Sequence, residues 1–335
     1  MKHGGPNRPV PGLPFLLSEA DEQEPPEPGR GLEGKVVGDY RLVTRLATGG
    51  MAEVWLADAL RGELLGRQAV VKRLRPQLRQ EPDCLQRFRA EAELSTGLRH
   101  PNLARGYGLF EAGADVFLVQ ELVGGETLSL LAAAARKGAG RLAPAAVVQA
   151  GAGLLAALQH LHGQGLVHAD VNPDNLVACA DGSVKLIDLG LAQVLDATGS
   201  VPSPDGALRG TPSYMSPEQV KSRPLDARSD LFSAGAALWE LFANRPLFAA
   251  LQEFETLRRV REWPAPPLRA VWPEAPTSLE RLLVRALAKD PLQRFQSAAQ
   301  FAGELLAAAA RAGLEDGRTA LAAEVARWAP RAPKT

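Results

Sequence analysis

The chain has 335 residues, and its 38 Lys and Arg residues balance its 38 Asp and Glu residues, so its formal net charge is zero. This balance argues against a strongly basic nucleic-acid-binding protein and against a polybasic membrane-surface protein. The length suffices for about two domains with a sizeable core. The two cysteines, Cys84 and Cys179, form no CxxC motif, so a disulfide framework is not expected and a reduced, cytoplasmic protein fits best.

The first 36 residues differ in composition from the rest of the chain. Seven prolines fall between Pro6 and Pro28, and residues 19–28 carry five acids and no base. Such a segment cannot bury enough apolar surface to offset its ordering entropy, so we expect a disordered tail. A solvated leader is the simpler interpretation of this tail, and a partner-docking arm is the alternative.

One uncharged stretch resembles a membrane span in composition. Residues 142–169 contain no Asp, Glu, Lys or Arg. The apolar part, residues 145–161, is shorter than the ~20 residues that a spanning helix needs, and it contains glycines and polar residues. We therefore predict a buried core helix there, no membrane anchor and, given the proline-broken N-terminus, no secretory signal.

The pattern of apolar residues predicts a sheet-rich region followed by a helical one. Residues 83–98 form a predicted helix, which must end before Pro101 because the residue before proline leaves the helical region. After residue 122 the chain becomes mostly helical to residue 308, with strand-like interruptions near 176–177 and 184–187. Residues 309–335 read as a tail with one short amphipathic helix at 320–328. The predicted strands of the first region are 40–43, 52–57, 67–72, 106–111 and 115–121.

Three clusters carry candidate chemistry, and the first is the turn around Gly49 and Gly50. These glycines would let backbone amides approach phosphate oxygens, although two glycines between strands are also common in simple hairpins. The second is Lys72, at the end of an apolar strand, where it must find a negative partner or reach solvent. Glu91, on the following predicted helix, is the candidate partner.

The third cluster combines residues 168–175 with residues 185–190. Asp170, Asn175 and Asp188 lie at the ends of short predicted strands. Two carboxylates and an amide at these spacings predict a Mg²⁺ site, because Mg²⁺ prefers oxygen ligands and keeps substrate phosphates in its shell. Turns capped by Asx side chains are the alternative for either half alone.

In this order and spacing, the motifs resemble those of the eukaryotic-like protein kinase family, especially its bacterial Ser/Thr branch. The resemblance covers roughly residues 40–307. It extends to a gatekeeper and hinge at 120–123, to the segments 210–218 and 226–235, and to the late motif 288–295. It implies an α+β, two-lobed fold. The N-lobe, 37–122, would hold a small antiparallel sheet and one main helix, and the C-lobe, 123–308, would be larger and mostly helical.

The resemblance also implies a role for each site residue. Asp170 would accept the proton of the attacking hydroxyl, and Lys72, paired with Glu91, would contact the phosphates of ATP. Asn175 and Asp188 would hold Mg²⁺, with Mn²⁺ as an alternative. On the substrate side, Thr211 would shape the site, and Glu218 would pair with Arg294. The residues implied to bind ATP are Ala47, Gly49, Gly50, Val54, Ala69, Lys72, Glu121, Val123 and Val177.

Three departures from the family pattern stand out. Only Gly49 remains of the three glycines of the family's loop, and Ala169 replaces the Arg that normally receives a phosphorylated activation loop. Asn172 replaces a Lys that contacts the transferred phosphate. Losing one such charge can cost on the order of 10²–10³ in rate.

The resemblance implies an ATP- and Mg²⁺-dependent kinase that phosphorylates Ser and Thr hydroxyls of proteins, slowed by Asn172 and Ala169. Its partners would be protein substrates and a regulatory partner that the sequence does not name. A pseudokinase, acting as a nucleotide-binding or partner-binding scaffold, is the alternative. A Tyr or dual-specificity kinase is a weaker alternative, as is a small-molecule kinase of similar fold.

Overall fold

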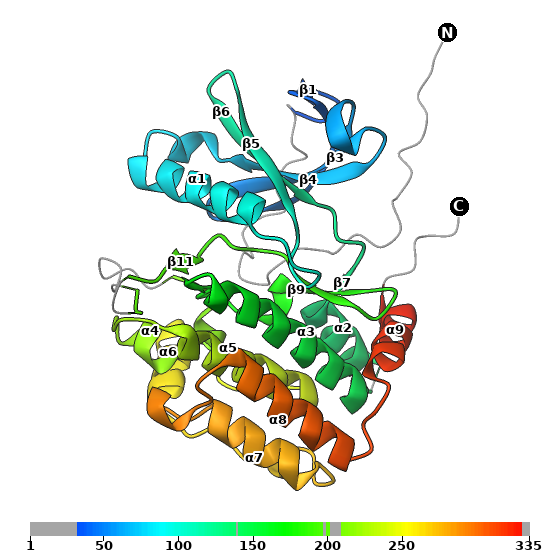
Figure 1. Ribbon diagram of the computed structural model, residues 1–335, viewed down its shortest axis with the longest axis vertical. Coiled ribbons are helices and arrows are strands. Elements are labelled where there is room, and N and C mark those ends of the chain that lie inside the picture. Colours follow the sequence, from blue (N-terminus) through cyan, green and yellow to red (C-terminus); the bar gives the residue numbers. More distant parts are fainter. Residues whose placement is uncertain (1–31, 139, 197–198, 202–208, 330–335) are drawn as a thin grey trace.

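A small lobe rich in strands lies above a larger helical lobe in the computed structural model of the protein (Figure 1). The structure describes residues 32–138, 140–196, 199–201 and 209–329, so most of the predicted N-terminal tail lies outside the described residues. The α+β, two-lobed fold predicted from the sequence is confirmed.

One six-stranded antiparallel sheet forms the N-lobe, with the strand order β1-β2-β3-β4-β6-β5. Alternation along the strands divides its apolar side chains between two faces. Trp55, Val71 and Phe117 lie in a cluster on one face, and Leu74 and Leu118 pack on the other face with helix α1. The elements are β1 Val36–Val37, β2 Tyr40–Thr48, β3 Ala52–Ala59, β4 Gln68–Leu74, α1 Pro82–Gly97, β5 Gly106–Ala112 and β6 Asp115–Glu121.

The C-lobe is a helical bundle with one continuous apolar core. Helix α3 lies inside this bundle and packs against α5, α8 and α9. It is long and apolar enough to cross a membrane by composition, but 61% of its apolar window is buried in the protein, as the predicted core helix requires. The helices are α2 Leu128–Lys137, α3 Pro144–Gly163, α4 Pro217–Val220, α5 Ala227–Ala243, α6 Glu253–Glu262, α7 Thr277–Ala286, α8 Ala298–Arg311 and α9 Gly317–Trp328.

Short strands cover the side of the C-lobe that faces the sheet (Figure 1). They form two small sheets, β10-β9-β7 and β11-β8. Gly125 in β7 lies so close to β9 that a Cβ atom there would be 2.2 Å from the carbonyl oxygen of Ala178, so only glycine fits. The strands are β7 Gly125–Thr127, β8 Leu166–Val167, β9 Leu176–Cys179, β10 Val184–Leu186 and β11 Gln193–Val194.

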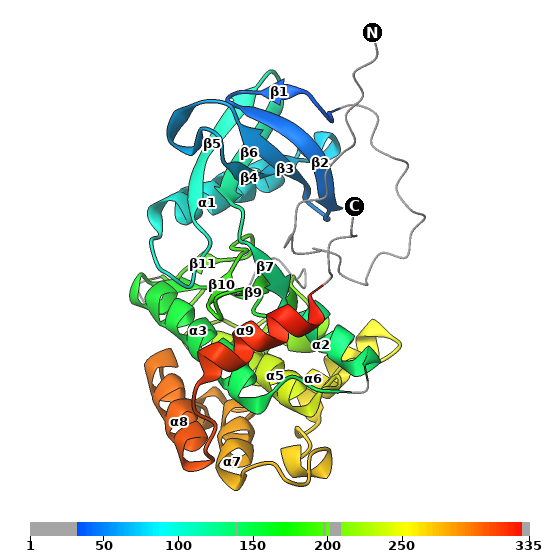
Figure 2. The same ribbon diagram turned by 90° about the vertical axis from the view of Figure 1, so that its right-hand side faces the viewer.

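The last helix, α9, lies across α3 and beside α2 (Figure 2). Leu321 and Val325 are buried in the C-lobe core. Glu324 Oε1 accepts a hydrogen bond from the backbone N–H of Ala143 at 3.0 Å. The amphipathic segment predicted at 320–328 is therefore a docked helix that begins three residues earlier, at Gly317.

Candidate active site

The side chains of Lys72, Glu91 and Asp188 meet where the sheet, α1 and the segment after β10 come together. Lys72 shares a sheet face with Leu74, which packs against α1, so strand alternation directs Lys72 toward this helix. Its Nζ lies 2.6 Å from Glu91 Oε1 and 3.0 Å from Asp188 Oδ1. The pairing that the sequence predicted between Lys72 and Glu91 is present.

Mutual attraction favours the charged forms of Lys72 and Asp188, whereas burial opposes the charge of Glu91. Burial opposes the positive charge of Lys72, but the carboxylates of Asp188 and Glu91 outweigh burial and hold the pKa of Lys72 above its ordinary value. Burial raises the pKa of Glu91 in spite of Lys72. Burial acts on Asp188 in the same direction, but Lys72 outweighs it, and the pKa of Asp188 is lowered. The Asp188 side chain is 43% exposed, so a ligand can still reach it.

Asp170 is held by hydrogen bonds to both of its carboxylate oxygens. Its Oδ1 accepts from the backbone N–H of Thr211 at 2.9 Å and from the Thr211 hydroxyl at 3.0 Å. Its Oδ2 accepts from Asn175 Nδ2 at 3.2 Å. The structure thus brings Thr211 to Asp170, as the sequence predicted for a residue that shapes this site.

The backbone that carries Asp170 is anchored from below by Asp230 of α5. The Asp230 carboxylate accepts the backbone N–H groups of His168 and Ala169, each at 2.9 Å. His162 Nε2 lies 2.8 Å from the same carboxylate. Ala169 has φ of 64°, in the left-handed region that non-glycine residues rarely adopt.

Asn175 and Asp188 occupy neighbouring positions at the open end of the β9–β10 hairpin. Strand β9 begins directly after Asn175, and the N–H of Ile187 donates to the Asn175 carbonyl at 3.0 Å. Asn175 Nδ2 donates to Asp170, so the Oδ1 atom of Asn175 is the one that would bind a metal. Carboxylate and amide oxygens are ligands that Mg²⁺ prefers, so the donor set fits this ion.

Only two protein side chains contribute to this donor set. Among the residues that the structure describes, no group of three or more His, Cys, Asp or Glu side chains could hold a metal ion. An ion at Asn175 and Asp188 would therefore complete its shell with water and substrate phosphates, as Mg²⁺ commonly does.

The residues predicted to surround the adenine lie on both sides of the junction between the lobes. Val123 and Val177 belong to one small buried cluster on the C-lobe side. Val54 pairs directly with Lys72 across β3 and β4, so it lies on the same sheet face as that lysine. Glu121 ends β6 at the start of the hinge. Its carboxylate accepts a hydrogen bond from Lys185 Nζ at 2.8 Å.

Ala47, Gly49 and Gly50 lie in and beside the turn between β2 and β3. Ala47 pairs with Val54, and the Gly49 N–H donates to the carbonyl of Ala52 at 2.8 Å. The turn therefore adjoins Val54, which is the position expected for a loop that covers the nucleotide phosphates.

The assignment of Ala69 to the nucleotide site is wrong. Its side chain is fully buried in the cluster of Trp55 and Val71, on the sheet face away from α1. Side chains two apart in a strand share a face, so the neighbour of Lys72 on the site side is Val70, which is only half-buried. Counting back two residues from Lys72 would have identified Val70 from the sequence.

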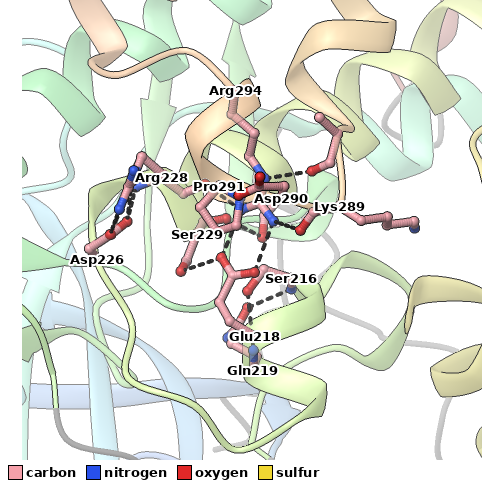
Figure 3. Close-up of polar contacts among 12 residues, drawn as sticks. Ser216, Glu218, Gln219, Asp226, Arg228, Ser229, Lys289, Asp290, Pro291 and Arg294 are labelled. Carbon is pink, nitrogen blue, oxygen red and sulfur yellow. Dashed lines mark hydrogen bonds and ion pairs between the residues drawn. The ribbon is translucent and has the colours of Figure 1, made fainter. Parts of the chain in front are cut away.

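Glu218 and Arg294 form a buried ion pair, as predicted (Figure 3). The guanidinium donates to both carboxylate oxygens, at 2.7 and 2.9 Å, and Ser229 Oγ donates to the same carboxylate at 2.7 Å. Burial opposes ionisation of Glu218, but Arg294 and Ser229 outweigh it and hold the pKa of Glu218 below its ordinary value. This pair ties the segment that follows Thr211 to the connection between α7 and α8.

The sequence interpretation overlooked Gln219. Its Nε2 donates to the carbonyl of Ala169 at 2.7 Å, so it holds the carbonyl of the residue whose N–H is held by Asp230. Gln219 also completes a capping box with Ser216 at the start of α4 (Figure 3). Ser followed three residues later by Gln is the sequence signature of this motif and could have revealed the position of Gln219.

Comparisons with known proteins agree with this geometry. The family model described as "Protein kinase domain" matches residues 40–305. A probable serine/threonine-protein kinase of Streptomyces coelicolor, SCO3848, is 38% identical over 266 residues, which cover 78% of this chain and 38% of that protein.

The serine/threonine-protein kinase PknB of Mycolicibacterium smegmatis is 36% identical over 80% of this chain and 42% of its own length. PknB of Mycobacterium tuberculosis is 35% identical over 80% of this chain and 42% of its own length. The chain therefore spans about two fifths of the length of these relatives.

Proposed function

The chain belongs to the eukaryotic-like serine/threonine protein kinase family, and on this premise we propose that it transfers the γ-phosphate of ATP to Ser and Thr hydroxyls of proteins. The observation that carries the proposal is the convergence of Lys72, Glu91 and Asp188 beside an Asp170 held in place by Thr211 and Asn175. We place the reaction in the cytoplasm, consistent with the two free cysteines.

Positioning and charge account for the proposed chemistry. Asp170 would orient the attacking hydroxyl and accept its proton, since both carboxylate oxygens are fixed by neighbouring donors. Lys72 would bind the phosphates of ATP, with Glu91 directing its ammonium group. Val54, Val70, Val123 and Val177 would enclose the adenine, and the hinge that starts at Glu121 would bind its edge.

Asn175 and Asp188 would hold the divalent metal ion. When bound, Mg²⁺ or Mn²⁺ would neutralise charge on the phosphates. Asp188 stays ionised for this purpose because Lys72 lowers its pKa.

A phosphate-transfer assay tests the proposal directly. Asp170→Ala should lower incorporation of label from [γ-³²P]ATP into a generic protein acceptor by at least about 10²-fold, the usual contribution of a proton-accepting side chain. Asp83→Ala is the matched control, because Asp83 is an exposed acid on α1. Analysis of the labelled residues should find phosphoserine and phosphothreonine.

Two outcomes would contradict the proposal. Absence of Asp170-dependent incorporation with either Mg²⁺ or Mn²⁺ would favour a pseudokinase that binds nucleotides or partners without transfer. Labelled tyrosine as the main product would favour the Tyr-kinase alternative.

A further inference from the structure

The side chain of Asn172 is engaged at both ends of its amide. It is buried, with 2% of its surface exposed. Its Nδ2 donates to the backbone carbonyl of Asp170 at 3.2 Å and to the Thr211 hydroxyl at 3.1 Å. Its Oδ1 accepts the backbone N–H groups of Asp174 at 3.0 Å and of Asn175 at 3.1 Å. These four contacts use the full hydrogen-bonding capacity of an asparagine side chain.

The two ends of this amide serve different parts of the site. The Nδ2 end holds Thr211, whose hydroxyl in turn donates to the Asp170 carboxylate. The Oδ1 end caps the single 3₁₀ turn Pro173–Asn175, which ends at the amide proposed to bind the metal. One side chain thus connects the proton acceptor to a metal ligand.

A lysine could supply only half of these contacts. Its ammonium is a donor without any acceptor, so it could bind Thr211 but could not accept the N–H groups of Asp174 and Asn175. The backbone carbonyl of position 172 also accepts the Asn175 N–H, at 3.2 Å, and would keep the turn partly closed. With asparagine in place of the family's lysine, position 172 therefore lacks a positive charge but caps the turn Pro173–Asn175.

We propose that Asn172 is a positioning residue that fixes Asp170, through Thr211, and Asn175 as one rigid unit, rather than a group that contacts the transferred phosphate. This inference rests on the proposed kinase function for its effect on turnover. Its effect on metal-dependent nucleotide binding is independent of turnover, because Asn175 and Asp188 hold the metal in either case.

Three substitutions of Asn172 separate the two ends of the amide. Asn172→Asp keeps both acceptor contacts and loses the donor. Asn172→Lys keeps a donor and loses the acceptors, and Asn172→Leu loses both with little change in size. For each variant we would titrate a non-hydrolysable ATP analogue by calorimetry, with Mg²⁺ and with EDTA, and measure kcat for phosphate transfer.

We expect the Lys and Leu variants to bind the analogue with Mg²⁺ about 3- to 30-fold more weakly, the range expected from loss of one helix cap. Binding in EDTA should not change in these variants, because it does not involve Asn175. The affinity of the Asp variant for the analogue with Mg²⁺ should stay within about threefold of wild type. Its kcat should fall at least about tenfold, because the Thr211 hydroxyl no longer accepts a hydrogen bond from residue 172.

Several results would overturn the inference. A Lys variant with higher kcat and unchanged Mg²⁺-dependent binding would show that position 172 serves the phosphate alone. A Leu variant equal to wild type in both measurements would show that Asn172 only fills space. If the Lys variant does not fold, Asn172→Ser, which retains one acceptor oxygen, must keep the Mg²⁺-dependent binding that the Leu variant loses.

The binding measurements also separate this inference from the proposed function. A wild-type protein without Asp170-dependent transfer would contradict the kinase proposal. The order Asp, Ser, then Lys and Leu in Mg²⁺-dependent affinity would still test the cap.

Discussion

Ala169 occupies the left-handed backbone region, with φ of 64°, in the loop that presents Asp170. This conformation costs a non-glycine residue roughly 1–2 kcal/mol in conformational energy, because its Cβ approaches the following carbonyl oxygen. Asp230 holds the N–H of Ala169 in place, and Gln219 holds its carbonyl. The position at which the family pattern has an arginine therefore carries a small side chain on a strained backbone.

We predict that substitutions at Ala169 change stability in the order of their tolerance for positive φ. Ala169→Gly should leave the free energy of unfolding unchanged or raise it by up to about 1 kcal/mol, since relief of the strain is partly offset by the flexibility of glycine in the unfolded chain. Ala169→Val should lower it by more than about 2 kcal/mol, because a branched side chain is a genuine outlier at positive φ.

Urea denaturation of the two Ala169 variants and wild type measures these differences. A Val variant as stable as wild type would mean that the loop does not adopt the left-handed conformation in solution. Phosphate transfer by the Gly variant would show in addition whether the fixed twist contributes to turnover.

At the scale of single elements, α9 lies beyond the family match, which ends at residue 305. It nevertheless completes the C-lobe core through Leu321. Arg318 at its start binds the carbonyl and carboxylate of Asp181, in the turn between β9 and β10. That hairpin carries Asn175 before its first strand and Asp188 after its second, so α9 is joined to the hairpin that positions the two residues proposed to bind the metal.

We predict that α9 is an integral part of the kinase fold and that a cavity in its interface destabilises the whole C-lobe. Leu321→Ala should lower the free energy of unfolding by about 2–5 kcal/mol, as for other buried leucines. Leu306→Ala on α8 is the matched control, because Leu306 is half exposed, and it should cost less than about 1 kcal/mol. Equal losses in chemical denaturation would contradict the docked position of α9.

The sequence predicted the positions of strands and helices more accurately than it predicted which side chains face the candidate site. The strands around Lys72 and the helix carrying Glu91 could be predicted because their apolar periods differ, 2 for strands and 3.6 for helices. The error at Ala69 comes from taking the motif at residues 69–72 without strand alternation. Ala69 lies three residues before Lys72, and this odd spacing turns the two side chains to opposite faces of the sheet.

Two tertiary contacts outside the pairs that the family motifs imply could not be predicted. The amphipathic pattern at 320–328 indicated a helix, but nothing local indicates that it docks on α3. The double role of Asn172 is a related case. An Asn before Pro-Asp-Asn signals a capped turn, whereas its bond to Thr211 joins residues 39 apart.

At the scale of the whole molecule, the pair of Glu218 and Arg294 joins segments 76 residues apart and is shielded from water. Because the folded pKa of Glu218 is lowered, its contribution to stability is fully present above its ordinary value of 4.5. That contribution is lost as the pH falls through the lower, folded pKa.

We predict that Glu218→Gln lowers the free energy of unfolding at pH 7 by roughly 3–5 kcal/mol, since Arg294 then remains buried without a counter-charge. Between pH 7 and pH 3 the unfolding temperature of wild type should fall more steeply than that of the variant. Glu253→Gln, on the exposed start of α6, should unfold like wild type at pH 7. Parallel pH curves for wild type and the Glu218 variant would contradict the prediction.

The docking of α9 also bears on how the chain folds during synthesis. Glu324 and its partner Ala143 are 181 residues apart, so the ribosome makes one side of this interface long before the other. At a synthesis rate of about 5–20 residues per second, α9 is made about 10–35 s after the apolar face of α3 that it covers. During that interval a nascent C-lobe presents uncovered leucine and alanine side chains to other chains. We therefore expect aggregation of the nascent chain to depend on translation speed as well as on the stability of the finished protein.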